Sequence, residues 1–174
     1  SYLATAVSIA QGEGCLLVTA AGNDNLSSDP SYLGTRSGVL AVAATNQSDG
    51  KASFSNYGAW VEISAPGVGI YTTAYNASTQ TSTYASVNGT SFSSPITAGA
   101  AALVWSANPS MNYSQVYSLL RSSADNIDDL NPGYVGELGT GRVNMLKALG
   151  DAQHRYPSEF PTLFDALNEA SEGD

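Results

Sequence analysis

The hydroxyl group of Ser91 is the first candidate for covalent chemistry in this sequence. It lies between Gly89-Thr90 and a long, almost uncharged run of small residues, which is typical of a nucleophile at the start of a buried helix. The first backbone N–H groups of a helix have no partner within it, so they favour negative charge nearby. The hydroxyl could instead serve only as a helix cap, a common role for serine at this position.

Two starts are compatible with the helix that carries Ser91. A cap at Ser94, with Pro95 in the first turn, would leave Ser91 in the preceding loop. A cap at Thr90 would place Ser91 in the first turn itself. In both cases we expect the helix to end near Ala107, because Asn108-Pro109 follows.

The residues before Ser91 predict a sheet. Residues 1–14 have the apolar spacing of an amphipathic helix, and 16–21 and 39–44 are apolar runs that we expect to be strands buried on both faces. Cys15 opens the first run, so we interpret it as a small core residue. The order helix, strand, loop, strand predicts an α/β fold with a mostly parallel sheet flanked by helices.

The middle of the chain has turn signals and no helical period. We expect short strands at 60–63, 69–72 and 83–87, followed by the Ser91 helix. A further helix is predicted at 113–123, and a short closing strand and helix within 142–149.

Composition divides the chain in two. The net charge is −9, and the tail of residues 150–174 carries much of it, with a predicted short amphipathic helix around 160–167. Residues 1–149 form the expected globular part. An acidic chain lacks the clustered Lys and Arg that a nucleic-acid or anionic-membrane partner requires, and no apolar run is long enough for a membrane span.

Three motifs in a fixed order resemble the subtilisin-like serine proteases, or subtilases. They are VTAAGN ending at Asn23, ASFSNYG followed by SAPG at 64–67, and NGTSFSSP leading into ITAGAAALV. GTSxxxP alone at the start of a small-residue helix would be weaker without the earlier AGN. The similarity extends over residues 1–149, and it implies the subtilisin-like three-layer fold, of which this chain would be the C-terminal part.

The resemblance implies roles for particular residues. Ser91 would be the nucleophile that forms an acyl-enzyme, and Asn23 would stabilise the oxyanion through its side-chain amide, together with the Ser91 backbone N–H. Asn23 could alternatively be only a turn residue after Gly22. The substrate-binding residues implied are Gly22, Asp24, Ser28, Asp29, Gly89 and Thr90.

The catalytic histidine and aspartate of the family precede the serine along the chain. Here the single histidine is His154, which follows Ser91 and which we interpret as a solvated residue and not as the general base. We therefore expect an N-terminal segment of the same protease domain to be the partner that supplies Asp and His. Residues 1–174 alone should be inactive, because a serine without its base is a weak nucleophile.

Two further expectations concern the pocket and a cation. Asp24 and Asp29 would favour Lys or Arg before the scissile bond, although solvated loop carboxylates are the simpler interpretation. Glu62 stands where related enzymes often hold a structural Ca²⁺ or monovalent cation, against the alternative of an ordinary edge-strand glutamate. Asp125, Asp128 and Asp129 lack calcium-loop spacing and are interpreted as a solvated turn. No cofactor is required for the chemistry, and the family resemblance implies a secreted or otherwise extracytoplasmic location.

Three classes of function compete. The leading hypothesis is an endopeptidase that cleaves polypeptides through Ser91. A non-catalytic binding or scaffolding module with the same fold is the alternative, although packing alone requires neither Ser91 nor Asn23. An esterase of the α/β-hydrolase type would need a GxSxG elbow where this chain has GTSFS.

Overall fold

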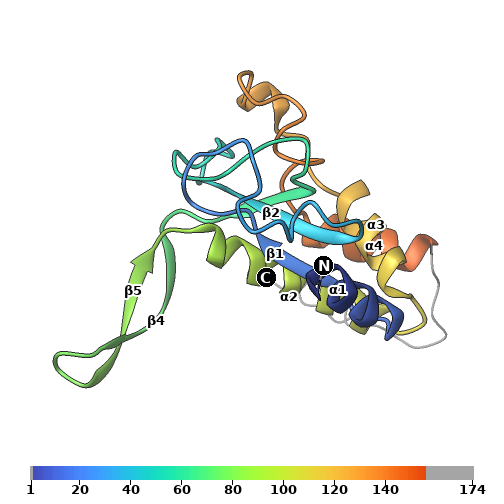
Figure 1. The fold of residues 1–174 in the computed structure, drawn as a ribbon, viewed down its shortest axis with the longest axis horizontal. Coiled ribbons are helices and arrows are strands. Elements are labelled where there is room, and N and C mark those ends of the chain that lie inside the picture. Colours follow the sequence, from blue (N-terminus) through green and yellow to red (C-terminus); the bar gives the residue numbers. More distant parts are fainter. Residues whose placement is uncertain (1, 156–174) are drawn as a thin grey trace, which may run out of the picture.

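The computed structural model describes residues 2–155 and has a parallel sheet at its centre (Figure 1). The sheet has the order β1-β2-β3, and a separate antiparallel hairpin is formed by β4 and β5. The strands are β1 (Leu17–Ala20), β2 (Val39–Thr45), β3 (Ile63–Pro66), β4 (Ile70–Asn76) and β5 (Thr81–Val87). The helices are α1 (Tyr2–Gly12), α2 (Thr90–Ala107), α3 (Tyr113–Ser122) and α4 (Met145–Arg155), with a short 3₁₀ turn, η1 (Asp128–Leu130). This arrangement confirms the predicted α/β class.

The central strand β2 is buried along its whole length. It pairs in parallel with β1 on one side and β3 on the other. Successive side chains of a strand point to opposite faces, so Leu40 and Val42 join the core on the α2 side while Ala43 joins a second cluster. That second cluster includes Tyr57 and Leu138, which come from loops. The apolar composition of this strand from Val39 to Ala44 follows from its two covered faces.

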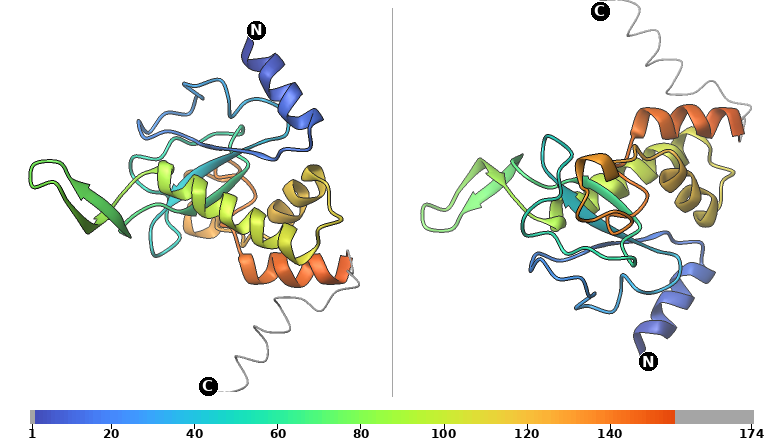
Figure 2. Two further views of the ribbon diagram at one scale, coloured as in Figure 1. Left: turned by 90° about the horizontal axis from the view of Figure 1, so that it is seen from below. Right: turned by 90° about the horizontal axis from the view of Figure 1, so that it is seen from above.

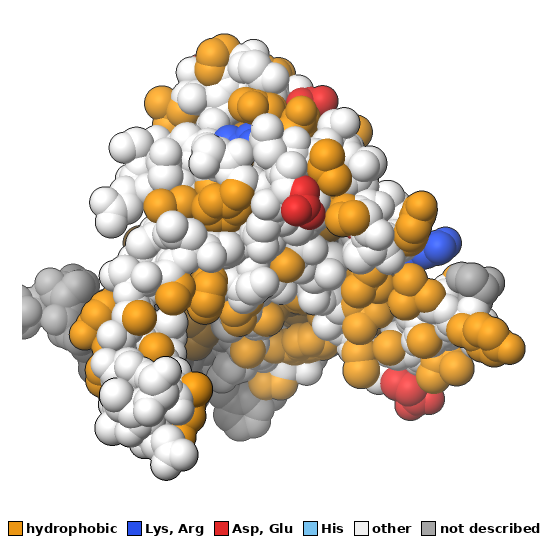
Figure 3. Space-filling model, turned by 60° about the vertical axis from the view of Figure 1, so that its left-hand side comes forward, with side chains coloured by type: hydrophobic (Ala, Val, Ile, Leu, Met, Phe, Trp, Pro, Cys, Tyr) orange, Lys and Arg blue, Asp and Glu red, His pale blue; other side chains and the backbone are white. Residues whose placement is uncertain are grey.

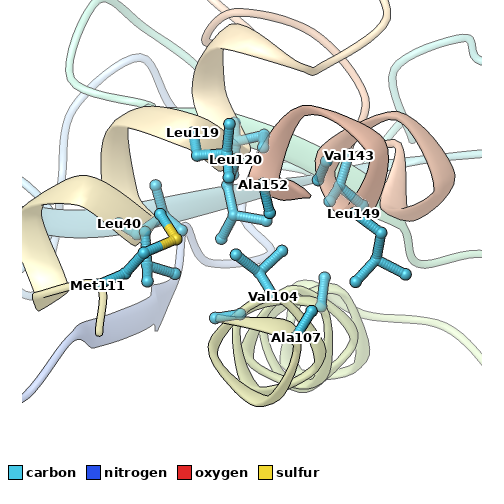
Figure 4. Packing of buried hydrophobic residues seen from close by; sticks show 14 of the residues in the cluster. Leu40, Val104, Ala107, Met111, Leu119, Leu120, Val143, Leu149 and Ala152 are labelled. Atoms are coloured by element: carbon cyan, nitrogen blue, oxygen red, sulfur yellow. The ribbon is translucent and has the colours of Figure 1, made fainter. Parts of the chain in front are cut away.

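The main core lies between the sheet and three helices. Helix α2 crosses one face of the sheet, and α4 packs along the C-terminal half of α2 (Figure 2). Val104 and Ala107 of α2 lie near Leu149 and Ala152 of α4, with Leu120 of α3 close by (Figure 4). Helix α3 begins at a capping box in which Asn112 and Gln115 each accept a backbone N–H bond from the other residue. The alanines of α2 allow these helices to approach closely.

The first strand differs from the prediction of burial on both faces. β1 is only half-buried, and Cys15 just before it is exposed, so its interpretation as a core residue was wrong. The physical reason is position, because β1 is an edge strand that pairs only with β2 among residues 2–155. An apolar run cannot tell from its own composition whether a neighbouring strand will cover it.

Several strands and helices have boundaries that differ from the predicted ones. The strand expected at 60–63 begins only at Ile63, since Trp60 lies in a turn, and the two strands of the hairpin are longer than expected. Helices α1, α2 and α3 lie within a few residues of their predicted ranges, whereas α4 continues to Arg155, six residues beyond the predicted 142–149. The closing strand predicted in that range is only an isolated β-bridge at Arg142. The helix predicted at 160–167 and the rest of the acidic tail lie outside the described residues. In the part of the chain that the structure describes, no helix has the length and apolarity to cross a membrane.

Asp125 connects the closing segment to the body. Its backbone N–H donates to Arg142 O at 2.8 Å, and its carboxylate accepts from Arg142 Nη2 at 2.6 Å and from Asn144 Nδ2 at 3.0 Å. Residues 141–143 in turn pair with the outer edge of β3 at Ser64. The interpretation of Asp125 as part of a merely solvated turn was therefore wrong, because its partners lie 17 and 19 residues away.

These contacts predict a pH-dependent contribution to stability. The hydrogen bond from Asn144, followed by the bond and charge of Arg142, lowers the pKa of Asp125 from its usual 3.8. A lowered folded-state pKa stabilises the fold above the unfolded pKa, and this stabilisation is lost as the pH falls through the folded value. We expect Asp125→Asn to lower the urea midpoint near neutral pH, with the difference from the parent shrinking below pH 3.8.

The exposed neighbour Asp129 offers a matched control. Asp129→Asn should leave the midpoint unchanged at both pH values. An Asp125→Asn midpoint equal to that of the parent near neutral pH would contradict the structural role of the carboxylate.

Candidate active site

Ser91 is the second residue of helix α2 and its side chain is exposed. Gly89 precedes the helix with φ of 153°, a conformation that side chains rarely adopt, and Thr90 is the first helical residue. The structure therefore places Ser91 in the first turn, as the earlier of the two predicted starts does, although the N-cap is Gly89 and not Thr90. Pro95 lies inside the helix and not at its start.

Two of the first three N–H groups of α2 are hydrogen-bonded, and one is not. Thr90 N–H donates to Asn23 Oδ1 at 2.9 Å, and Phe92 N–H donates to Gly89 O at 3.1 Å. For the Ser91 N–H between them, residues 2–155 provide no acceptor, and the first turn of α2 contains no acidic residue. A free donor at the positive end of an 18-residue helix can stabilise an anion beside the Ser91 hydroxyl.

Asn23 lies just beyond β1, and Thr90 holds its side chain in one orientation. Asn23 Oδ1 accepts two hydrogen bonds, from Thr90 N–H at 2.9 Å and from Thr90 Oγ1 at 3.0 Å. A backbone N–H can only donate, so the oxygen of the amide must face Thr90 and the nitrogen must point away. Asn23 Nδ2 has no acceptor within the described part of the chain, which leaves it available to an incoming oxygen atom.

The Thr90 hydroxyl also fixes the backbone on the other side of Asn23. While it donates to Asn23, it accepts from Gly22 N–H at 3.1 Å. Gly22 has φ of 103°, and a Cβ there would lie 2.4 Å from Asn56 Nδ2. A side chain at Gly22 would therefore disturb the turn that carries Asn23.

Asn56 is a positioning residue whose role the sequence analysis did not assign. It is buried, its Oδ1 accepts from the N–H groups of Asp24 and Leu26 at 3.0 and 2.9 Å, and its Nδ2 donates to Ala21 O at 2.9 Å. Three bonds from one amide thus shape the turn on both sides of Asn23. The available signal was the ASFSNYG motif, in which Asn56 directly precedes Tyr57.

Lys51 supports the same loop from outside. Its Nζ donates to Asn25 Oδ1 at 2.7 Å and lies over the rings of Tyr57 and Tyr134, 4.9 and 4.7 Å from their centroids. Burial lowers the pKa of Lys51. Asn25 has a positive φ of 54°, so this contact stabilises a residue in a less common backbone conformation.

The two acids expected in the substrate pocket have different environments. Asp24 is exposed, as is Ser28. Asp29 is buried, and its carboxylate accepts from Ser31 N–H and Oγ at 2.9 and 2.8 Å and from Thr35 N–H at 3.1 Å. The carboxylate of Asp29 therefore holds its own loop together, which leaves Asp24 as the accessible acid.

Glu62 is engaged with protein groups. Its Oε2 lies 2.9 Å from Arg121 Nε, and burial together with a hydrogen bond to Glu62 raises the pKa of Tyr117 to about 12. A cation at this position would have to compete with the Arg121 guanidinium. No group of three or more His, Cys, Asp or Glu residues that could hold a metal occurs in the described ranges. The Glu62 cation site stays a prediction.

The backbone of α4, which includes His154, lies away from Ser91. Helix α4 packs beside Val104 and Ala107 (Figure 4), and Val104 is 13 residues beyond Ser91 in the same helix, or about 20 Å along its axis at 1.5 Å per residue. The side chain of His154 lies outside the described residues.

Charge is absent from the elements on the Ser91 side of the site. From Ile63 to Leu120 the chain contains no Asp, Glu, Lys, Arg or His, and this range includes β3, the hairpin and all of α2. The polar groups beside Ser91 are the backbone dipoles at the start of α2 and the Asn23 amide, and the nearest charge in the sequence of the Asn23 loop is the exposed Asp24. Such a site is suited to stabilising a transient negative charge that is not permanently neutralised by a cation.

Comparison with known proteins agrees with this geometry. The model of the subtilase family matches residues 1–145. Subtilisin BL from Lederbergia lenta is 42% identical over 142 residues, which are 82% of this chain and 49% of the relative. Thermitase from Thermoactinomyces vulgaris is 39% identical over 149 residues, or 86% of this chain and 49% of the relative. The chain thus spans about half the length of these relatives.

Solved structures give the same result for the fold. A protease from Pseudoalteromonas arctica superposes with a TM-score of 0.77 at 31% identity, covering 86% of this chain and 46% of that one. The patellamide maturation protease PatA superposes with a TM-score of 0.76 at 31% identity, covering 88% of this chain and 57% of that one. The family match over residues 1–145, the relatives at 42% identity and the arrangement of Ser91, Thr90 and Asn23 lead to one conclusion: this chain belongs to the subtilase family.

Proposed function

We propose that this chain is the serine-bearing part of an endopeptidase that cleaves polypeptides through an acyl-enzyme on Ser91. The observation that supports the proposal most is the orientation of the Asn23 amide, whose oxygen is bound by Thr90 and whose Nδ2 is free beside the start of α2. Packing alone does not require an exposed amide to be held in this way. A scaffold would serve equally well with the amide reversed or absent.

The chemistry follows from the two donors. Ser91 Oγ attacks the carbonyl carbon of the peptide bond while a histidine removes its proton, and the carbonyl oxygen becomes an oxyanion. Asn23 Nδ2 and Ser91 N–H donate to that oxyanion. The amine then leaves with the proton from the histidine, and water hydrolyses the acyl-enzyme by the same steps in reverse. The base and its aspartate come from a segment other than residues 2–155.

Two surfaces support docking of such a segment. The outer edge of β1 has unpaired strand positions in the described structure, and a parallel sheet extends readily at such an edge. On α2, exposed positions follow helical spacing from Ser91 through Pro95 to Ala98, Gly99 and Ala102, and these small side chains permit close packing. A segment that covers both surfaces would lie beside Ser91.

The first prediction concerns reassembly. Residues 1–174 alone should not react measurably with a fluorophosphonate, because loss of the histidine from a subtilisin triad costs about 10⁶-fold in kcat. Adding the segment that carries Asp and His, from the same protein, should restore labelling and hydrolysis of a peptide ester. Mass spectrometry should place the label on Ser91, with Ser91→Ala as the unlabelled control. Absence of labelling in a folded, reassembled domain would favour the scaffold reading.

A second prediction concerns Asn23 in the reassembled enzyme. Asn23→Asp keeps the oxygen that accepts from Thr90 but replaces the Nδ2 donor with a second oxygen, which would repel the oxyanion. We expect kcat to fall by about 10²–10³-fold for Asn23→Ala, a value taken from a subtilisin and not calculated from this structure, and at least as far for Asn23→Asp. KM should change little, since the donor acts on the transition state.

Thr90→Val provides the graded comparison. It removes one of the two bonds to Asn23 Oδ1 and keeps the backbone bond, so its loss in kcat should lie between those of the parent and Asn23→Ala. If Asn23→Asp retained the parental kcat, the amide could not be an oxyanion donor.

The pocket expectation becomes a proposal about Asp24. Gly22, Gly89 and Thr90 would form the backbone around the reacting carbonyl, while Asp24 and Ser28 would face the side chain before the scissile bond. Asp24 is exposed and Asp29 is internally bonded, so only Asp24 should attract a Lys or Arg side chain.

The corresponding prediction compares two substrates. In the reassembled enzyme, Asp24→Asn should lower kcat/KM for cleavage after Lys by about fivefold relative to cleavage after Leu, the scale of a partly exposed ion pair of about 1 kcal/mol. Asp29→Asn should instead lower thermal stability without changing that ratio. A parent enzyme that cleaves equally well after Leu and Lys would contradict the role of Asp24.

The remaining proposals come from the family alone. We propose secretion, no cofactor for the chemistry, and a structural Ca²⁺ or monovalent cation near Glu62.

A further inference from the structure

The β4–β5 hairpin is the part of the molecule that the proposed chemistry leaves without a role. It projects from the body of the domain in every view (Figures 1 and 2). Its two strands pair over seven positions, from Ile70 opposite Val87 to Asn76 opposite Thr81. A two-stranded ribbon of this kind has marginal stability in water by itself. We therefore asked whether the side chains on its surface serve a function.

Three tyrosines share one face of this ribbon. In the register, Tyr71 lies opposite Ser86, Tyr84 opposite Thr73, and Tyr75 opposite Ser82, so all six side chains point to the same side. The tyrosines are 72%, 63% and 65% exposed, respectively. Tyrosine can contribute large contact areas at low conformational cost, as it does in binding loops, and serine and threonine between the rings provide adaptable hydrogen bonds.

A hollow of about 430 Å³ lies on the hairpin between Tyr75 and Tyr84. Thr73 and Ser82 contribute to its lining. On its far side, the ring of Tyr84 stacks on Tyr71 with a centroid separation of 5.5 Å and an interplanar angle of 18°. That stacking braces one wall of the hollow. The open hollow with two aromatic walls and hydroxyl groups between them is suited to a planar, uncharged ring.

The surroundings of the hollow also exclude a charged ligand. No charged residue occurs from Ile63 to Leu120, and in the view that brings the hairpin forward, apolar and uncharged polar surface predominates (Figure 3). A phosphate, a nucleic acid or a strongly charged peptide would therefore find no complementary group on the hairpin.

The hairpin is continuous with the proposed nucleophile. β5 ends at Val87, and Gly89 N–H donates to Gly67 O at 2.8 Å, which closes the base of the hairpin just before α2. Tyr84 is seven positions before Ser91, so the hollow lies within about 25 Å of the hydroxyl at 3.3–3.6 Å per residue. An extended polypeptide bound at Ser91 would cover that distance with about seven residues.

We propose that the β4–β5 hairpin is a substrate-binding arm, and that the hollow between Tyr75 and Tyr84 receives an aromatic ring of the polypeptide several residues from the scissile bond. This inference rests on the proposed endopeptidase function. It names the substrate as an extended, uncharged, ring-containing polypeptide segment. Short peptides that end near the scissile bond would not reach the arm.

Kinetics of the reassembled enzyme test the arm directly. The substrates share one scissile sequence: a short ester, and long peptides with a single Phe or Ala placed at successive positions up to eight residues on either side. We expect one position at which Phe raises kcat/KM by about three- to tenfold over Ala, the scale of one aromatic contact. Tyr75→Ala and Tyr84→Ala should each abolish that preference and leave hydrolysis of the short ester unchanged.

Two variants serve as controls. Tyr75→Phe keeps the ring and should retain the preference, while Tyr2→Ala removes an exposed tyrosine from α1 and should have no effect. A preference for Phe that persists in Tyr75→Ala and Tyr84→Ala would overturn the proposal, as would the absence of any preferred position.

A binding measurement separates failure of the arm from failure of the proposed function. Fluorescence anisotropy of a labelled Phe-containing peptide is measured with the full chain carrying Ser91→Ala, so that no catalysis is needed. Saturable binding that weakens in Ser91→Ala/Tyr75→Ala supports the arm even if hydrolysis is never observed. Equal binding of the Phe and Ala peptides would overturn the proposal. So would displacement of the peptide by a neutral polysaccharide such as hydroxyethylcellulose when the Phe and Ala peptides bind equally.

Discussion

The junction between Asn23 and Thr90 is the interaction on which the site depends. It joins the end of β1 to the start of α2 across 67 residues of chain, and the Thr90 hydroxyl extends it to the backbone of Gly22. Without it, the amide of Asn23 would rotate freely at an exposed position, and its donor would have no defined direction. One threonine therefore converts a flexible side chain into a fixed donor beside the free N–H of Ser91.

The rest of the structure serves to keep that junction rigid. The side chain of Asn56 makes three backbone hydrogen bonds in total, one to Ala21 before Asn23 and two to Asp24 and Leu26 after it. The ammonium group of Lys51 donates to the side chain of Asn25. Below them, β2 is buried over its whole length and α2 packs on all three strands of the sheet. A preorganised donor needs no reorganisation during reaction, which is the physical reason that such a loop is stabilised by several buried bonds.

Uncharged composition has opposite consequences on the two sides of Ser91. Toward α2, small and apolar residues allow close packing of helices and leave an exposed stripe of low bulk, consistent with docking of another segment. Toward the hairpin, the same absence of charge means that the ribbon can bind a polypeptide only through its aromatic rings and hydroxyl groups. The site between them is thus governed by oriented dipoles, and the two acidic residues near it act locally, Asp29 within its loop and Asp24 toward solvent.

The sequence by itself determined the α/β class, the order of the elements, the family resemblance and the position of Ser91 at a helix start, because apolar period, turn residues and short motifs are local properties of the chain. It placed Asn23 near Ser91 only through the resemblance. The tertiary structure decided that the helix begins at Thr90, that the Asn23 oxygen faces Thr90, and that Asn56 shapes the turn. It also assigned Asp29 and Asp125 to internal bonds and left Cys15 exposed on an edge. Each of these depends on which groups packing brings together, and the partners of Asn23, Asn56 and Asp125 lie far from them in the chain.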